Sequence, residues 1–217
     1  LQLLWILCRS FALLPHFVRH NIFGTLCYWV LCYVLRYRRR VIMDNLRRSF
    51  PDYSEQQLNT ICRDTYKNLA EQIINTISQS GVSEKTLLHR MVITNAEATR
   101  KAINGRSAIL LTAHYGPWEA GSTVSLVFPE QTIVAVYHKI TSPVMDELMK
   151  RIRMHKNVEL VDMKRTMRHF VDNRDKRPMA LGLIADQNPF WYPDAHWINF
   201  FHQARLTLFL NSTPRGP

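Results

Sequence analysis

The stretch AILLTAHYGPWEAG, residues 108–121, passes from a continuous apolar run into a histidine, a glycine and a proline. The run at 108–113 is apolar on both alternating faces, which predicts a strand that is buried on both sides. Pro117 suits the first position of a helix, because the N–H that proline lacks has no helical partner there. A buried strand that leads into a helix is typical of a parallel sheet covered by helices.

Strand-like and helical patterns alternate along the chain from about residue 90. Short apolar, β-branched runs predict further strands at residues 91–94, 132–137, 158–162 and 179–185. Helices are predicted between them, one from Asn95 to about Asn104, one capped by Ser142 with Pro143 at its first position, and one at about 164–174. We therefore expect an α/β fold with a mainly parallel central sheet flanked by helices. Ligands of such sheets bind beyond the carboxyl ends of the strands, where the clusters HYGPWE and DQNP lie.

A long amphipathic helix is predicted ahead of this region, within residues 52–81. Its apolar residues recur at helical spacing. Ser54 and Gln57 have the spacing of a capping box, and Gly81 follows at the place where a helix commonly ends in a left-handed glycine.

The positive charge of the chain is concentrated at its start. The net charge is +11, and residues 1–50 hold eight arginines and one acid, Asp44, so that 8 − 1 = +7 of it lies there. Two apolar runs, residues 1–8 and 22–35, are each shorter than the roughly 18–20 residues of a spanning helix. Trp, Tyr and Arg border them as at a membrane interface. We expect residues 1–40 to form a hydrophobic and basic membrane-associating segment, and residues 41–217 a second domain.

The membrane-associating segment has more than one interpretation. It suits a single tilted or re-entrant anchor, or amphipathic helices that lie in the bilayer surface. A buried core helix capped by solvated arginines is the alternative without a membrane. The four cysteines have no C-x-x-C spacing, which indicates a reducing cytoplasm and argues against structural zinc.

His114 and Glu119 are the candidate catalytic pair. Five residues apart, they would diverge by about 140° on one regular helix. They converge only where His114 lies in a turn and Glu119 in the first turn of a helix, and Gly116 and Pro117 favour that arrangement. Spacing alone favours a non-catalytic interpretation, in which the glutamate stabilises the helix and the histidine is a satisfied polar residue. The chain has no G-x-S-x-G, H-E-x-x-H or Gly-rich phosphate loop, which favours direct attack by a substrate hydroxyl.

Four segments of the chain together resemble one family. AHYGPWE is similar to the H-x-x-x-x-[D/E] motif of the late lipid A biosynthesis acyltransferases, within the glycerolipid acyltransferase superfamily, although Pro117 stands where the family often has Asn. The basic run RYRRRVIMDNLRRSFPD (36–52), VYHKITSPVMDELMKRIR (136–153) and IADQNP (184–189) resemble three further family segments in the same order. Family members continue for tens of residues beyond the last of these, so we expect the acyltransferase domain, 41–217, to be C-terminally incomplete or altered.

The resemblance implies an enzyme and a reaction. It implies transfer of a fatty acyl chain from an acyl carrier protein thioester to a hydroxyl of a lipid A precursor, at the cytoplasmic face of the inner membrane. His114 would act as the general base and Glu119 would orient it, with backbone amides between Gly116 and Glu119 stabilising the oxyanion. No metal or cofactor is implied; the carrier protein thioester, or a coenzyme A thioester, is a co-substrate.

The resemblance also implies roles for residues around the pair. Gly116 and Trp118 are candidates for substrate binding, together with Arg151 and Arg153, which match the family's R-x-R and suit phosphate or carrier contacts. The last two candidates, Asp186 and Gln187, follow the strand predicted at 179–185. Asn45 matches the family's N-L position. The arginines of 36–40 suit anionic lipid headgroups.

Three alternatives stay open from the sequence. The same residues suit another lipid acceptor, a lysophospholipid or a glycosylated phosphoinositide. The chain also suits a non-catalytic, basic protein of the membrane surface. Nucleic-acid binding is permitted by the charge, but no recognition motif is present, so we do not expect a nucleic-acid partner.

Overall fold

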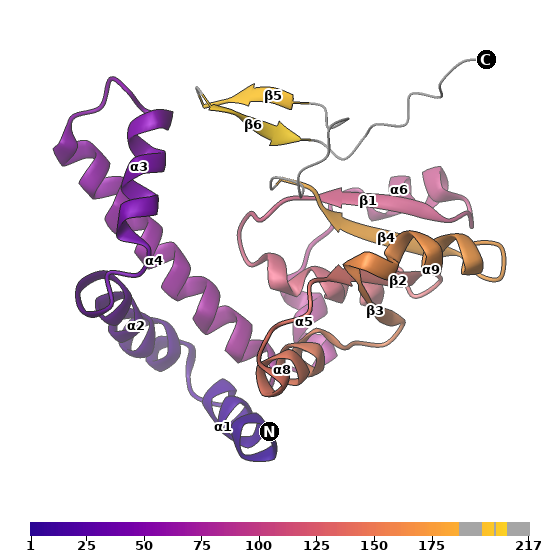
Figure 1. The fold of residues 1–217 in the computed structure, drawn as a ribbon. Helices are drawn as coiled ribbons and strands as arrows, with labels where there is room; N and C mark the ends of the chain where they lie inside the picture. Colours follow the sequence, from indigo (N-terminus) through magenta and orange to yellow (C-terminus); the bar gives the residue numbers. More distant parts are fainter. Residues whose placement is uncertain (187–196, 202, 208–217) are drawn as a thin grey trace. The chain divides into compact units, whose positions relative to one another are not determined.

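The computed structural model describes residues 1–186, 197–201 and 203–207 (Figure 1). It divides into two compact units: residues 1–15 with 75–183, and residues 16–74 with 184–217. Each unit has a hydrophobic core of its own. The boundary predicted at residue 40 concerned membrane association, and it stays a prediction.

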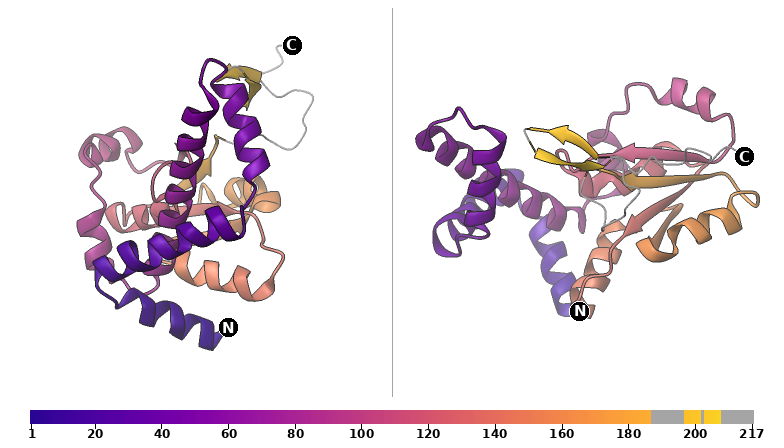
Figure 2. Two further views of the ribbon diagram at one scale, coloured as in Figure 1. Left: turned by 90° about the vertical axis from the view of Figure 1, so that its left-hand side faces the viewer. Right: turned by 45° about the horizontal axis from the view of Figure 1, so that its top comes forward.

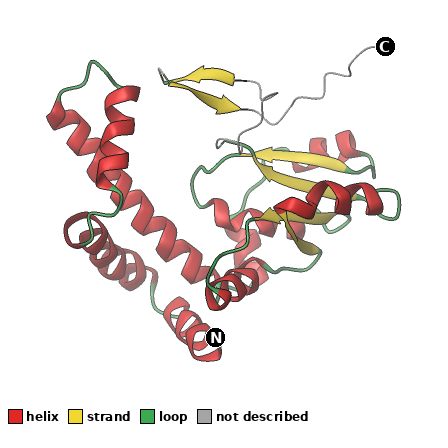
Figure 3. Cartoon of the chain, in the orientation of Figure 1, coloured by secondary structure: helices red, strands yellow, loops and turns green. Residues whose placement is uncertain are grey.

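The first unit is built on a four-stranded sheet with the strand order β1-β4-β2-β3 (Figures 1 and 3). Its strands are β1 (Ala108–Thr112), β2 (Thr132–Tyr137), β3 (Val158–Asp162) and β4 (Met179–Ile184). The central strand β2 pairs in parallel with β3, Ile133 opposite Val158, and with β4, Thr132 opposite Met179. The predicted α/β class with a parallel sheet is confirmed.

The helices of this unit are α5 (Glu84–Arg90), α6 (Ala96–Ile103), α7 (Val124–Val127), α8 (Pro143–Arg153) and α9 (Thr166–Asn173), with short 3₁₀ segments η3 (Trp118–Thr123) and η4 (Met163–Arg165). Three of them, α6, α8 and α9, lie close to where the sequence predicts them, whereas α5 was not predicted. The Ser142 hydroxyl accepts from the amide of Met145 and Pro143 is the first residue of α8, as predicted. Asn104 ends α6 in the left-handed conformation, with φ 48°.

Side chains at alternating strand positions form a core on each face of the sheet. On one face, Phe170 of α9 packs against the cluster of Val134 and Leu181. On the other face, Val124 of α7 packs against the cluster of Ile133. The two faces are therefore covered by different helices, which is the layered arrangement that apolar strands require.

Two sequence predictions about strands are wrong in detail. Residues 91–94 form no strand, and Val92 exposes 79 % of its surface, because no neighbouring strand pairs with this run in the described part of the chain. Strand β1 is not buried on both faces: Ile109 and Leu111 are 53 % and 46 % exposed. β1 lies at the edge of the sheet, with a neighbouring strand on one side, and Leu110 is its side chain that packs against the cluster of Ile133.

The N-terminal helix α1 (Gln2–Ala12) packs in the first unit, against α8 and the end of α4 (Figure 2). Its buried Cys8 joins Leu148 and Ile152 of α8 in one cluster. Gly81 allows the approach, because a Cβ on this residue would lie 2.6 Å from the Cβ of Ala12. The sequence predicted that Gly81 ends a helix in the left-handed conformation. This is wrong, because Gly81 is not among the glycines with positive φ. Its observed role is the close contact with Ala12.

The second unit is mainly helical. It holds η1 (Val18–Gly24), α2 (Thr25–Trp29), η2 (Val30–Val34), α3 (Arg39–Ser49), most of α4 (Glu55–Gln79), and the antiparallel hairpin of β5 (Trp197–Phe200) and β6 (Gln203–Thr207). Its core consists of Leu31, Cys32, Met43, Leu58, Cys62, Tyr66 and Ala70. The predicted capping box is confirmed, since the Ser54 amide donates to the Gln57 side chain at 2.8 Å and the Gln57 amide donates to the Ser54 hydroxyl.

Residues 18–34 form one continuous helical run in which two π-helical segments flank α2. This confirms the helical character predicted for the N-terminal segment. Within the described ranges, no helix combines the length and the apolar character that crossing a bilayer requires.

Candidate active site

A tight turn follows β1 and carries His114. Gly116 adopts φ +58°, in the left-handed region where glycine is free of steric cost. The Tyr115 amide donates to the carbonyl of Ala113 and the Trp118 amide to the carbonyl of Gly116, each at 2.8 Å. The bend that the sequence predicts at Gly116 is confirmed.

Pro117 differs from its predicted place by one residue and by helix type. It precedes the 3₁₀ segment η3 as its N-cap, with φ −77° and ψ 58°, and the α-helix begins only at Val124. Proline has no N–H, and the Trp118 amide is used inside the turn. Since Pro117 has no N–H to offer, this engages one of the amides expected as oxyanion donors between Gly116 and Glu119, that of Trp118.

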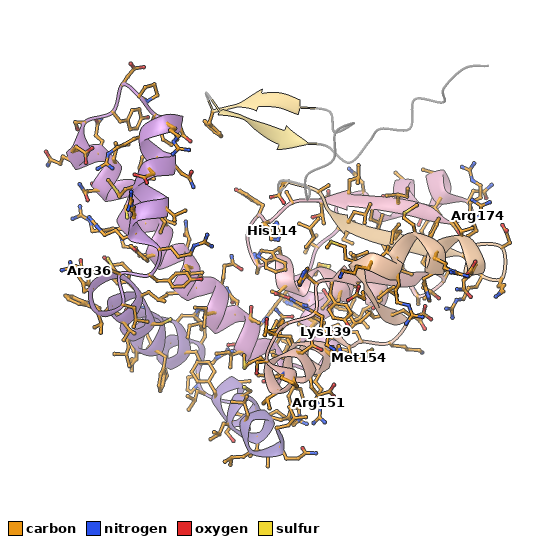
Figure 4. The ribbon with its side chains drawn as sticks, viewed as in Figure 1. Arg36, His114, Lys139, Arg151, Met154 and Arg174 are labelled. Carbon is orange, nitrogen blue, oxygen red and sulfur yellow. The ribbon has the colours of Figure 1, made fainter. Side chains whose placement is uncertain are left out.

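His114 and Trp118 contact each other through their rings. The ring centroids lie 4.7 Å apart and the planes meet at 71°, an edge-to-face arrangement. His114 is exposed and Trp118 is half-buried. The histidine lies on the loop beyond the carboxyl end of β1, where ligands bind in this class of sheet (Figure 4).

Glu119, in the first turn of η3, forms a two-pronged ion pair with Arg153 at the end of α8. Arg153 Nε donates to Glu119 Oε2 at 2.7 Å, and Arg153 Nη2 donates to Glu119 Oε1 at 2.6 Å. The side chains are only 10 % (Glu119) and 18 % (Arg153) exposed. This fork geometry is the strongest common form of a carboxylate–guanidinium contact.

The two arginines of R-x-R have different surroundings. Arg151 Nε donates to Glu147 at 3.2 Å, one turn earlier on the same helix, and its Nη1 donates to the side chain of Gln2 at 3.5 Å. Residues two apart on a helix are separated by about 200°, so one helix cannot direct both side chains to the same place. Of the two arginines, Arg153 is the one that contacts Glu119.

A buried carboxylate that the sequence analysis missed fixes the loop after β2. Asp146 accepts a hydrogen bond from the Ile140 amide at 2.8 Å and pairs with Lys150 at 2.7 Å. The Lys150 hydrogen bond, and then the Ile140 amide, lower the pKa of Asp146 below its usual value. Its i,i+4 spacing to Lys150 was a signal available in the sequence. The loop presents His138 and Lys139 as exposed side chains at the carboxyl end of β2.

A comparison with protein-family models matches residues 2–209 to the family described as bacterial lipid A biosynthesis acyltransferase. The chain belongs to this family. The resemblance inferred from the four sequence segments is thus confirmed, and the activity class of the chain is that of an acyltransferase. A comparison with curated proteins gives no match.

Two further candidate residues of this acyltransferase, Asn45 and Asp186, lie in the second unit. Asp186 is half-buried, two residues beyond the end of β4, whereas Gln187 lies outside the described residues. Asn45 is exposed on α3. In the ranges that the structure describes, no three His, Cys, Asp or Glu side chains gather as metal ligands do.

Proposed function

We propose that this acyltransferase moves a fatty acyl chain from an acyl carrier protein thioester to a hydroxyl of a lipid A precursor. The observation that carries the proposal is the turn at Gly116, which puts an exposed imidazole beyond the end of β1 and a carboxylate in the first turn of the next helix. Family membership supplies the reaction class. The alternative acceptors, a lysophospholipid or a glycosylated phosphoinositide, use the same chemistry.

His114 is the general base of the proposed reaction. Its imidazole takes the proton of the acceptor hydroxyl, whose oxygen attacks the thioester carbonyl carbon and forms a tetrahedral intermediate. Collapse of that intermediate breaks the carbon–sulfur bond, and the imidazolium returns the proton to the leaving thiolate. The products are the new ester and the free carrier thiol. Glu119 orients the imidazole and stabilises its cationic form.

The other predicted substrate contacts are part of the same proposal. Trp118 is proposed to contact the substrate, because its ring lies against that of His114. Arg151, Asp186 and Gln187 keep their proposed roles in substrate binding, as does the Gly116 backbone. The proposed reaction requires no metal or cofactor, since the thioester is already activated.

We further propose that the protein works at the cytoplasmic face of the inner membrane, on an anionic lipid surface. Large apolar side chains are exposed along the helical run of residues 18–34 and just beyond it, among them Leu26, Trp29, Val34 and Leu35. Trp29 is 54 % and Val34 74 % exposed. Exposed apolar helix surface next to arginines supports binding in the plane of the interface.

The test is an acyl-transfer assay with acyl carrier protein thioester and a lipid A precursor. The His114→Ala variant is expected to lose on the order of 100-fold or more in turnover, because it lacks the general base. His89→Ala is the matched control, since His89 is also exposed and lies in the last turn of α5, with no assigned role in the reaction. Near wild-type turnover in His114→Ala would eliminate the general-base role. Membrane binding without any acyl transfer would favour the non-catalytic alternative.

A further inference from the structure

Arg153 holds the glutamate of the proposed pair in a fixed plane. The guanidinium fork is rigid and planar, so two parallel hydrogen bonds set both the position and the plane of the carboxylate. Both oxygens of Glu119 take part. A carboxylate offers about four lone-pair sites, so each oxygen keeps a second site at an angle that the Arg153 fork determines.

The helix that carries Arg153 is itself anchored. Leu148 and Ile152 of α8 are 5 % and 3 % exposed, in a cluster with Cys8 of α1. At the start of the same helix, the buried Asp146 is tied to the loop after β2 through the Ile140 amide. The guanidinium is therefore presented by a helix that is packed along its length, which is the condition for precise orientation of a neighbouring group.

We propose that Arg153 is a positioning residue of the acyl transfer: its fork to Glu119 orients the carboxylate that in turn orients His114. This inference rests on the proposed function, and it replaces the phosphate or carrier contact that the R-x-R motif suggested for Arg153. The guanidinium nitrogens Nε and Nη2 could donate two parallel hydrogen bonds to a phosphate, but both already donate to Glu119. Arg151 remains the member of the motif for substrate contact.

The two-pronged contact with Glu119 requires an arginine at position 153 and cannot be made by a lysine. Lysine keeps the positive charge but has no planar pair of donors, so it cannot reproduce the two parallel bonds. Arg153→Lys is therefore expected to fold and to lose about 10-fold in kcat, and Arg153→Met about 100-fold, the range found when groups that orient a reactive residue are removed. The KM values for thioester and acceptor are expected to stay unchanged.

The test measures kcat and KM for the wild type, Arg153→Lys, Arg153→Met, Glu119→Gln and the double variant Glu119→Gln/Arg153→Met. Residues that act as one unit are not additive, so the double variant is expected to be no slower than Glu119→Gln alone. Arg47→Met is the control, because Arg47 makes a similar two-pronged contact, with Glu55, and has no assigned role in the reaction. Thermal unfolding of each variant checks that the protein is folded.

Three results would overturn the inference, and they differ from one another. A raised KM in Arg153→Lys with kcat unchanged would make Arg153 a substrate-binding residue. Losses that multiply in the double variant would show that Arg153 acts independently of Glu119. No turnover in the wild type would remove the proposed function itself, and the positioning role with it.

Discussion

Gly116 is the residue whose backbone conformation decides whether His114 and Glu119 can share a site. Its φ of +58° is accessible to glycine, whereas a residue with a Cβ pays about 1–2 kcal/mol in the left-handed region. No atom lies within 4 Å of the position that a Cβ would take, so the cost of a substitution is conformational and not steric. We predict that Gly116→Ala lowers the free energy of unfolding by about 1 kcal/mol and also reduces turnover.

Gly121 provides the matched control for this prediction. It follows five residues later inside η3, its φ is not positive, and a Cβ there also meets no atom within 4 Å. Gly121→Ala should leave stability unchanged or raise it slightly, because alanine loses less conformational entropy on folding. Urea unfolding of both variants makes the comparison. Equal effects at the two glycines would contradict the role assigned to the turn.

At the scale of secondary-structure elements, local signals predicted several helix boundaries, although not the α-helix start expected at Pro117. The caps at Ser54 and Ser142 were predictable because each is a hydrogen bond to an amide three residues away. The strand prediction failed at 91–94 because a β-branched run becomes a strand only where a neighbouring strand supplies its hydrogen bonds. The interior character of β1 was also wrong, since strand order in the sheet is set by tertiary packing.

The candidate site could be predicted only in part for the same reason. The turn at Gly116 follows from residues that are adjacent in sequence. The partner of Glu119 lies 34 residues away, and spacing does not show which arginine of R-x-R points toward it. Helix rotation and the burial of Ile152 decide that Arg153 faces Glu119 while Arg151 faces Glu147.

Packing of α1 on the first unit depends on a contact between two small residues. A Cβ on Gly81 would lie 2.6 Å from the Cβ of Ala12 and 3.2 Å from the carbonyl oxygen of Arg9, so α1 would have to move. We predict that Gly81→Ala lowers the free energy of unfolding by about 1–3 kcal/mol, as overpacking commonly does. Since α1 packs on the helix that ends in Arg153, turnover should fall as well.

A compensating substitution separates this packing effect from a backbone effect. Ala12→Gly removes the Cβ that the new methyl group meets, so the double variant Gly81→Ala/Ala12→Gly should recover part of the lost stability. Ala12→Gly alone should cost up to about 1 kcal/mol, from the lower helix propensity of glycine. Chemical denaturation of the three variants gives the coupling energy. Strict additivity would show that the two positions are not in contact.

On the scale of the whole molecule, much of the excess positive charge lies in the first 50 residues, which precede the strands of the sheet in the sequence. Eight of its 28 Lys and Arg residues lie in the first 50 positions, against one of its 17 acids. Arg36, Arg38 and Arg40 are exposed, whereas Arg39 turns back to α4 and donates to Asn59 at 2.6 Å. Three of these four arginines, next to exposed apolar side chains of the same unit, are thus available to an anionic surface.

The location of this charge, and not only its total, should govern membrane binding. Each Lys or Arg near an anionic bilayer contributes about 1 kcal/mol at low salt, so changing Arg36, Arg38 and Arg40 together to Gln should weaken binding to phosphatidylglycerol vesicles on the order of 100-fold. The effect should shrink as salt is added, because screening shortens the range of the attraction. Co-sedimentation with anionic and with neutral vesicles measures it.

The control changes three exposed cations of the first unit, Lys101, Arg168 and Lys176, to Gln, which removes the same net charge. Equal losses in the two triple variants would mean that net charge alone attracts the protein, and that the basic segment beside the apolar helical run has no special part in membrane binding.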